Sequence, residues 1–374
     1  MKHTILITGA AGYVGGMLVE QFAKRDDVER IIGIDKEPIP DHFRDEPKLV
    51  YLHANVADGW EEQARAYRPD IVIHTAWQIR EMYGDQATEW KWNVGGSDKV
   101  FDFAFAEKSV ERLVYFSTVS SYGAFPSNTL EHRYTEDEPF RKSEYLYAEE
   151  KRFVEEHLKE KYEKSLAANA GKAKLTVAIV RPAAITGPRG RFMRIRFGLQ
   201  SALAGQLKDS FVYRVISAMV SFVPVTPKWL RQFIHEDDVT GIIERLAFGE
   251  KAGAYEVFNI CPPGPVVLGP DMAKAVGKRQ VLVYPWMVRI PFFIFWHLTR
   301  GKIPTGRGAW RGYSYPIAVD GSKVTRELGY AYRYSGPDAF RYTDGVYEKF
   351  VPENLRRHPS TANAGALGYG AGKK

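Results

Sequence analysis

The chain has 374 residues, of which 45% are hydrophobic and 13% aromatic, enough apolar material for two domains or for one large domain with a lobe. The formal net charge of +7 suits anionic ligands, but no nucleic-acid-binding motif accompanies it, so no nucleic-acid partner is expected. The single cysteine, Cys261, excludes an intramolecular disulfide and a cysteine metal cluster, and it fits a reducing cytoplasm. Cys261 follows an apolar run and is predicted to fill the core. No metal site is expected.

The first predicted element is a strand at residues 4–8, and its start near the N-terminus leaves no room for a signal peptide. It runs into Thr8-Gly9-Ala10-Ala11-Gly12-Tyr13-Val14-Gly15 and then into a helix at about 13–24. In such a strand–turn–helix unit the first glycine permits the turn, the second admits a pyrophosphate and the third allows close helix packing. Unpaired amides at the helix N-terminus bind the phosphates. The motif predicts a dinucleotide site that includes Gly9, Gly12, Tyr13, Val14 and Gly15.

Asp35 ends the second predicted strand, residues 30–34, twenty residues after Gly15. A carboxylate at this spacing accepts hydrogen bonds from the adenosine ribose and repels a 2′-phosphate. The neighbouring Lys36 would compensate part of that repulsion. Asp35 and Lys36 are therefore assigned to the cofactor site, and NAD is favoured over NADP.

Short apolar runs alternate with helical stretches up to Pro182. Continuous apolar runs of this length are typical of strands buried on both faces of a parallel sheet. The strands are expected at 4–8, 30–34, 49–53, 70–74, 112–117 and 175–180, and the helices near 13–24, 58–67, 87–107 and 145–164. The expected fold is a Rossmann-type, doubly wound α/β domain with a smaller, mainly helical C-terminal substrate lobe.

Tyr147 and Lys151 lie four residues apart in a strongly helical stretch and so project from one helix face. An adjacent ammonium and a positively charged nicotinamide ring favour the tyrosinate and bring the phenol into range as a base. The same spacing at Tyr369 and Lys373 near the C-terminus is a chance match. Hydroxyls at the end of the fifth strand can reach the ligand crevice; the candidates are Ser117, Thr118, Ser120 and Ser121.

Beyond Pro182 the pattern changes. A helix is expected at about 197–222, strands at 232–235 and 255–260 are expected to return to the sheet, and 263–352 reads as helical. This organisation predicts an NAD-binding domain at 1–182 with 232–262, a substrate lobe at 183–231 and 263–355, and a disordered tail at 356–374.

The longest apolar stretch, 285–298, is interrupted by Arg289 and Pro291 and is too short to span a bilayer. No transmembrane segment is expected. A role as helix core or oligomer contact is favoured over a lipid role, and peripheral membrane contact stays open. The arginines at 189, 191, 194 and 196 read as a solvated face, with a substrate phosphate as the alternative.

With these motifs in order, the chain resembles the extended short-chain dehydrogenase/reductases, the NAD-dependent epimerase/dehydratase group that includes UDP-glucose 4-epimerase and, more distantly, 3β-hydroxysteroid dehydrogenases. The resemblance covers about residues 3–350. Further matching motifs are Asn93-Val94-x-Gly-Ser, Ser117-Thr118 before Tyr122-Gly123, Arg181-Pro182 before Gly187-Pro188, Arg231-x-Phe-Ile-His235-x-Asp-Asp238, Asn259, and Asp320-x-Ser-Lys323 before Leu328-Gly329.

The resemblance implies that Thr118 donates a hydrogen bond to substrate, Tyr147 is the acid/base, and Lys151 assists it and holds the nicotinamide ribose. Asn93 would support the site. Asn55 and Val56 match an Asp-Val that contacts adenine, and His74-Thr75-Ala76-Trp77 matches a His-x-Ala-Ala pattern except at Trp77, whose indole changes the substrate pocket. The remaining implied cofactor contacts are Ala76, Ser117 and Pro182.

The resemblance also implies that Arg231 binds a substrate diphosphate and that Arg307 or Arg311 supplies a second guanidinium. The segment before Arg231 lacks the Gly-rich turn usual in nucleotide-sugar enzymes. The favoured interpretation is an NAD-dependent epimerase/dehydratase acting on a nucleotide-sugar, with a homodimer expected. Two alternatives remain: a 3β-hydroxysteroid-dehydrogenase-like enzyme for a hydrophobic alcohol, and a non-catalytic NAD-binding scaffold or sensor.

Overall fold

The computed structural model describes residues 2–169, 171, 173, 175–190, 222–250, 253–275, 279–353 and 356–359. The helix expected at 197–222 lies outside these residues except for Phe222, which begins a strand. The arginines at 191, 194 and 196, the chance pair Tyr369/Lys373 and residues 360–374 of the expected tail also lie outside them.

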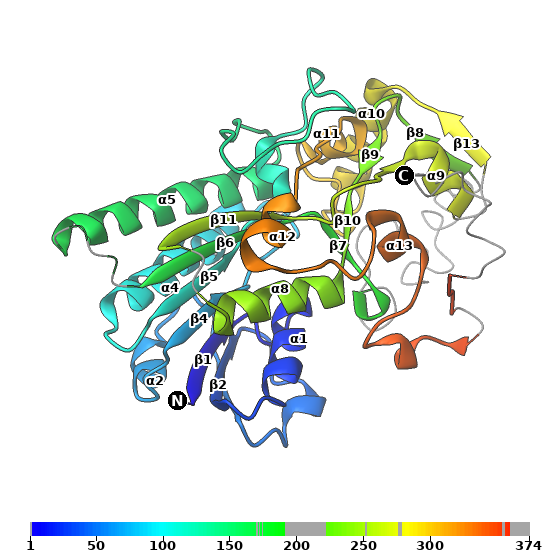
Figure 1. Ribbon diagram of the computed structural model, residues 1–374. Coiled ribbons are helices and arrows are strands. Elements are labelled where there is room, and N and C mark those ends of the chain that lie inside the picture. Colours follow the sequence, from blue (N-terminus) through cyan, green and yellow to red (C-terminus); the bar gives the residue numbers. More distant parts are fainter. Residues whose placement is uncertain are drawn as a thin grey trace.

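A seven-stranded parallel sheet forms the centre of the molecule (Figure 1). Its strand order is β11-β6-β5-β4-β1-β2-β3, and all neighbouring pairs are parallel. The strands are β1 His3–Thr8, β2 Val28–Asp35, β3 Leu49–His53, β4 Ile71–His74, β5 Arg112–Phe116, β6 Thr176–Pro182 and β11 Tyr255–Ile260. The chain order reverses beside β1, which creates the crevice at the carboxyl ends where ligands bind in such sheets. The predicted doubly wound fold is confirmed.

Helices cover both faces of this sheet (Figure 1). On one face, α1 Tyr13–Phe22 and α8 Glu236–Phe248 pack with Ile5 and Ile7 of β1. On the other, α2 Glu61–Arg65, α4 Gly96–Ala106 and α5 Leu146–Ala168 pack with Leu6. Because consecutive side chains of a strand point to opposite faces, burial on both sides explains the unbroken apolar runs in the sequence.

Two segments differ from expectation. The predicted helix at 87–107 is divided into α3 Gln86–Trp90, a π-helical turn η2 Lys91–Gly95, and α4. Strand β10 Phe233–His235 does not return to the main sheet but pairs in parallel with β7 Ala184–Thr186. The two three-residue strands form their own small sheet beside the main one, whereas β11 joins the main sheet next to β6.

The C-terminal elements include short strands as well as the expected helices. Strand β8 Phe222–Val225 pairs with β13 Arg279–Leu282, and β9 Leu230–Arg231 pairs with β12 Val267–Leu268. The helices are α9 Gly269–Ala275, α10 Pro285–Leu298, α11 Ala309–Ser314, α12 Ser322–Leu328 and α13 Gly336–Arg341. No helix in the described ranges is long and apolar enough to cross a membrane.

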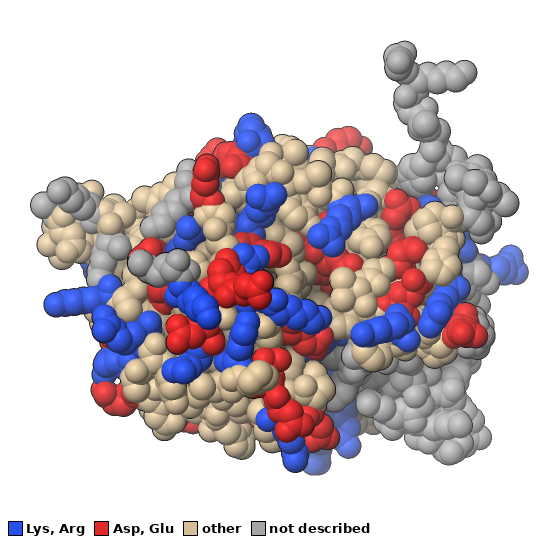
Figure 2. Space-filling view, turned by 60° about the horizontal axis from the view of Figure 1, so that its bottom comes forward, with Lys and Arg blue, Asp and Glu red and all other residues tan. Residues whose placement is uncertain are grey.

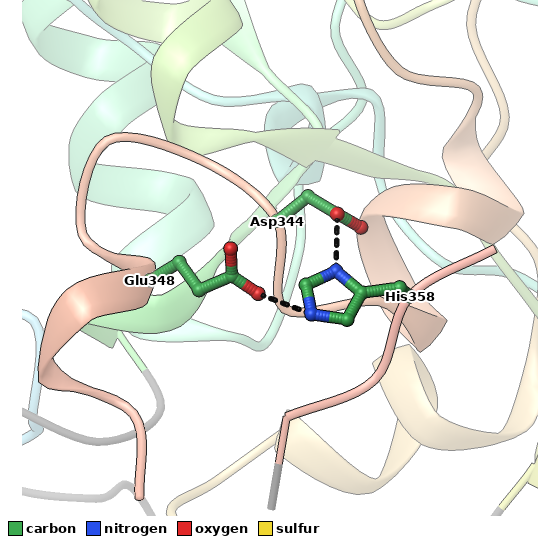
Figure 3. A group of neighbouring side chains, drawn as sticks. All are labelled: Asp344, Glu348 and His358. Carbon is green, nitrogen blue, oxygen red and sulfur yellow. Dashed lines mark hydrogen bonds and ion pairs between the residues drawn. The ribbon is translucent and has the colours of Figure 1, made fainter. Parts of the chain in front are cut away.

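The start of the expected tail is held against the molecule. His358 bridges Asp344 at 2.8 Å and Glu348 at 3.2 Å through its two ring nitrogens (Figure 3). The hydrogen bond to Asp344 raises the pKa of His358. These three side chains are spaced for a metal ion, but the imidazole already joins both carboxylates, so the cluster is explained as an ion pair that fastens residues 356–359.

Basic and acidic side chains are intermingled on the face seen in Figure 2. That face therefore has no extended field of one sign that would attract a polyanion. Cys261 is buried in the core cluster, and burial raises the pKa of its thiol, as expected for a cysteine that packs rather than reacts.

Candidate active site

The glycine turn between β1 and α1 is shaped to receive a ligand closely. Gly9 has φ +75°, and a Cβ there would lie 2.8 Å from the amide nitrogen of Ala76. A Cβ on Gly12 or Gly15 would lie 2.9 or 2.1 Å from the carbonyl oxygen of Gly9. Helix α1 has no side-chain N-cap and no acid in its first turn, so the helix itself supplies no anion to its first amides. These features fit a dinucleotide pyrophosphate.

Asp35 lies at the carboxyl end of β2, directly beside the glycine turn. Its carboxylate accepts from the amide of Ala11 at 3.0 Å and from that of Glu37 at 2.9 Å. Burial raises the pKa of Asp35, although both hydrogen bonds oppose the shift. Lys36 points instead toward Gln78 at 3.1 Å and lies over the Trp92 ring at 4.4 Å. The predicted ribose acceptor is thus in place, and it also anchors the turn.

A buried polar chain connects the glycine turn to the neighbouring helix. Thr8 Oγ1 lies 2.6 Å from His74 Nδ1, and His74 Nε2 lies 2.8 Å from Ser97 Oγ. Burial lowers the pKa of His74 to about 3, so this imidazole is neutral. Thr8 Oγ1 also accepts from the amide of Ala76 at 3.2 Å, which fixes the loop after β4.

Asn93 sits in the π-helical turn, where the register change turns its amide inward. It accepts from the amide of Gln78 at 2.7 Å, donates to the Gln78 carbonyl at 3.1 Å and donates to Glu150 Oε2 at 2.7 Å. The expected supporting role of Asn93 therefore takes the form of a link between the loop after β4 and helix α5.

The other cofactor candidates line the same edge. The Asn55 side chain accepts from the amide of Ala57 at 2.9 Å, and Val56 is buried below it. Ser117 follows β5, and its buried hydroxyl has no hydrogen-bond partner in the described part of the chain. Pro182 ends β6.

Tyr147 and Thr118 come together at this edge. Burial raises the pKa of Tyr147, and the nearby Thr118 hydroxyl partly offsets this shift. Thr118 also caps the short helix η3 Val119–Tyr122 by accepting from the amide of Ser120 at 3.1 Å. Another hydroxyl candidate, Ser121, donates instead to the carbonyl of Ala148 at 3.2 Å. Of the two, Thr118 is the one placed beside the phenol.

Lys151 lies one turn beyond Tyr147 on α5, but its surroundings differ from expectation. The ammonium is buried, donates to the carbonyl of Phe116 and lies 3.6 Å from the centre of the Trp77 ring. Burial lowers the pKa of Lys151 well below its ordinary value. Trp77 also stands edge-on to Tyr147, with ring centres 6.4 Å apart. The indole that replaces a small residue thus forms a wall against both members of the predicted pair.

A group of buried carboxyls beside Tyr147 escaped the sequence analysis. Glu89 and Glu150 are almost fully buried, and burial raises the pKa of each to about 7. Burial also raises the pKa of Glu81, whose Oε2 has no hydrogen-bond partner among the described residues. The charges of Glu81 and Glu89 act on Tyr145, whose ring centre is 5.7 Å from that of Tyr147. Glutamates in polar stretches of a sequence are ordinarily predicted to be solvated, so only the tertiary packing reveals that these three carboxyls are withdrawn from solvent.

The raised pKa of Glu150 gives a pH prediction. Between its ordinary value of 4.5 and about 7, the folded protein binds more protons at this carboxyl than the unfolded chain does. The protonated carboxyl of Glu150 therefore contributes to the free energy of unfolding at low pH, and this contribution is lost as the pH rises through 7. Glu150→Gln keeps an acceptor for Asn93, and should raise the free energy of unfolding by up to about 3 kcal/mol at pH 8 relative to pH 4.5.

Denaturant titrations of wild-type and variant protein at several pH values measure this difference. The control is Glu160→Gln, an exposed carboxyl on the same helix, which should leave the pH profile of wild type unchanged. Parallel profiles for wild type and Glu150→Gln would contradict the assignment.

The three predicted substrate arginines have different partners. Arg231, at the end of β9, is paired with no carboxylate in the described part of the chain, and burial lowers its pKa. The neighbours that favour its charge are Tyr313 and Tyr145. Arg311 pairs with Glu144 at 3.2 Å, whereas the amide and the charge of Arg307 act on Glu81. Among these three arginines, Arg231 is the one that is half-buried with no carboxylate partner in the described part of the chain.

Several other polar residues of the matched motifs have structural partners. Arg189 is buried and pairs with Glu20, so the expected solvated face is wrong for this residue. Arg181 pairs with Glu155 within the fold. Asp238 accepts from Tyr330 at 3.0 Å and from the amide of Arg333 at 2.9 Å. These contacts join the segment after β7 to α1, β6 to α5, and α8 to the C-terminal segment.

Known proteins share this sequence pattern and fold. The model of the NAD dependent epimerase/dehydratase family matches residues 5–261. An uncharacterised protein of Mycobacterium tuberculosis is 27% identical over 345 residues, covering 90% of this chain and 82% of that protein. A 3β-hydroxysteroid dehydrogenase/Δ5→4-isomerase of vaccinia virus is 26% identical over 196 residues, covering 50% of this chain and 54% of the viral protein.

Among solved structures, UDP-glucuronic acid 4-epimerase of Bacillus cereus, in complex with UDP-glucuronic acid and NAD, superposes with a TM-score of 0.64 at 17% identity. The match covers 92% of this chain and 99% of that chain and shows the shared fold. The chain belongs to the NAD dependent epimerase/dehydratase family. It is an NAD-dependent enzyme of the extended short-chain dehydrogenase/reductase type, as the motifs predict.

Proposed function

We propose that this enzyme oxidises and reduces a carbinol carbon of a nucleotide-sugar, with Tyr147 as the acid/base. The single observation that carries the substrate class is Arg231, a half-buried guanidinium without a carboxylate partner among the described residues. Tyr145 connects it to the reaction site, because the charge of Arg231 acts on Tyr145 and the Tyr145 ring lies beside that of Tyr147. An anionic diphosphate would supply the opposite charge that this guanidinium lacks.

In this proposal the glycine turn holds the pyrophosphate, Asp35 accepts from the ribose and Asn55 with Val56 contacts the adenine. Ala76, Asn93, Ser117, Lys151 and Pro182 complete the cofactor site. The unpartnered hydroxyl of Ser117 and the tight cradle at Gly9 and Gly15 support the fit. When bound, NAD supplies the hydride acceptor and a positively charged ring.

The remaining chemistry falls to the chain's own residues. Thr118 donates to the substrate oxygen, and Tyr147 takes the hydroxyl proton as the carbon is oxidised and returns it on reduction. Lys151 keeps a positive charge near the phenolate, with the Trp77 ring stabilising the ammonium. Burial opposes the ionisation of both the Tyr147 phenol and the Lys151 amine. The phenolate and the ammonium therefore stabilise each other only when they lie close together.

A thermal-shift screen of NAD-loaded protein tests the substrate class. UDP and dTDP should raise the melting temperature by a few degrees, as expected when the concentration of a ligand is well above its dissociation constant. Adenosine monophosphate serves as a control nucleotide. No response to nucleotides, together with stabilisation by a sterol, would favour the hydrophobic-alcohol alternative that the similarity to the viral steroid enzyme supports.

Cofactor preference gives a separate prediction. Calorimetric titration should show NAD binding at least about tenfold more tightly than NADP, a difference of about 1.4 kcal/mol or more. The reason is that Asp35 gains ribose hydrogen bonds and repels a 2′-phosphate. Asp35→Asn should narrow the difference, and equal affinities in wild type would contradict the role of Asp35.

A further inference from the structure

Exposed apolar side chains are concentrated on one segment outside the site. Nine of the fifteen large hydrophobic residues that are exposed in the described chain lie between Val281 and Leu298, in β13 and α10. Trp286, Phe293 and Leu298 are 62%, 64% and 65% exposed. Contiguous apolar surface of this kind marks an interaction site in a folded protein.

Helix α10 has two apolar faces with different surroundings. With 3.6 residues per turn, Trp286, Ile290 and Phe293 share the outward face. On the opposite side, Val288 and Trp296 are buried, and Trp296 contacts Tyr83 at a ring-centre distance of 5.4 Å. The expected core role therefore holds only for the inner face, and the outer apolar face is not required for packing.

The charged side chains within this segment of the chain are all of one sign. No Asp or Glu occurs from residue 272 to residue 319. The exposed basic residues Arg279, Arg289, Arg300 and Lys302 flank the helix, and none of them pairs with a carboxylate in the described ranges. A second copy of the same face would oppose cation to cation, whereas anionic lipid headgroups complement both the charge and the apolar surface.

We propose that the outward face of α10, with β13, docks on the surface of an anionic lipid bilayer. A helix of 14 residues is about 21 Å long, against a hydrocarbon core of about 30 Å, so it lies in the interface rather than across it. Tryptophan and phenylalanine insert at the headgroup boundary while the arginines and lysines contact the phosphates. In Figure 1, α10 lies at the upper right, far from the N-terminus.

Docking there bears on the active site, because α10 contacts the loop after β4. Tyr83 of that loop lies 3.0 Å from His297 Nδ1, and the same loop carries Trp77 and Glu81. The helix proposed to face the bilayer thus contacts the loop that carries Trp77 and Glu81. This inference does not depend on the proposed substrate.

Vesicle co-sedimentation of the full-length protein tests the proposal. Wild type should bind vesicles containing phosphatidylglycerol, bind phosphatidylcholine vesicles weakly, and be released by salt. Trp286→Ser/Phe293→Ser should weaken binding by about tenfold or more, and Arg300→Glu/Lys302→Glu should abolish the preference for anionic lipid. Both pairs should leave NAD binding unchanged.

The matched control is Val346→Ser/Phe350→Ser, which removes two exposed apolar side chains elsewhere, 60% and 49% exposed. It should bind vesicles like wild type. Absence of vesicle binding by wild type, or an equal loss in this control, would overturn the proposal. A wild-type dimer in sedimentation equilibrium that the Trp286/Phe293 pair dissociates, without vesicle binding, would identify a second copy as the occupant instead.

Discussion

Tyr147→Phe is expected to lower turnover by about a hundredfold or more while leaving NAD affinity nearly unchanged. The substitution removes one oxygen from a ring held between Trp77 and Tyr145, so the packing of the aromatic wall is retained. What is lost is the proton acceptor and its interaction with the Thr118 hydroxyl. Steady-state kinetics with a UDP-sugar and calorimetric titration with NAD measure the two effects separately.

Two controls sharpen this result. Tyr369→Phe removes the tyrosine of the chance Tyr-x-x-x-Lys match and should change neither quantity. Tyr145→Phe removes a phenol from the adjacent ring and should lower turnover far less than Tyr147→Phe. Full activity of Tyr147→Phe would disprove the acid/base assignment. A wild type that binds NAD and turns over no substrate would favour the scaffold or sensor alternative.

Arg231→Ala is expected to raise the KM for a UDP- or dTDP-sugar by about ten- to a hundredfold, because each charge-assisted contact to a phosphate is worth about 1.5–3 kcal/mol. NAD affinity should be nearly unaffected, since the residue lies on β9 away from the glycine turn. UDP alone should compete with substrate in wild type and much less in the variant.

The other arginines supply the comparison. Arg311 already pairs with Glu144, so Arg311→Ala should have a smaller effect on KM than Arg231→Ala. Arg231→Lys keeps the charge but loses the fork of donors and should be intermediate. Unchanged KM in Arg231→Ala, with no competition by UDP, would show that the substrate carries no diphosphate at this position.

The sequence alone determined the parallel sheet, and it predicted the glycine turn at which we propose that the cofactor binds. Local signals suffice there: a strand buried on both faces is an unbroken apolar run, and a close backbone approach requires glycine at Gly9, Gly12 and Gly15. The spacing of Tyr147 and Lys151 likewise follows from the helical repeat, which fixes the shared face without tertiary information.

Tertiary packing decided what local pattern leaves open. The π-helical turn that aims Asn93 at Glu150 depends on contacts between α5 and the loop after β4, and no periodicity encodes it. Long-range strand pairing also caused small differences from the predicted sheet: β10 pairs with β7 instead of joining the main sheet.

The same limit applies to charge and exposure. In sequence, Arg189, Arg231 and Arg311 are alike, yet one pairs with Glu20, one has no carboxylate partner among the described residues and one pairs with Glu144. The apolar stretch at 285–298 predicted a helix, but only the fold shows which of its faces is buried. An ion pair or an exposed face depends on residues distant in the chain, so composition and spacing specify the groups and the tertiary structure decides their partners.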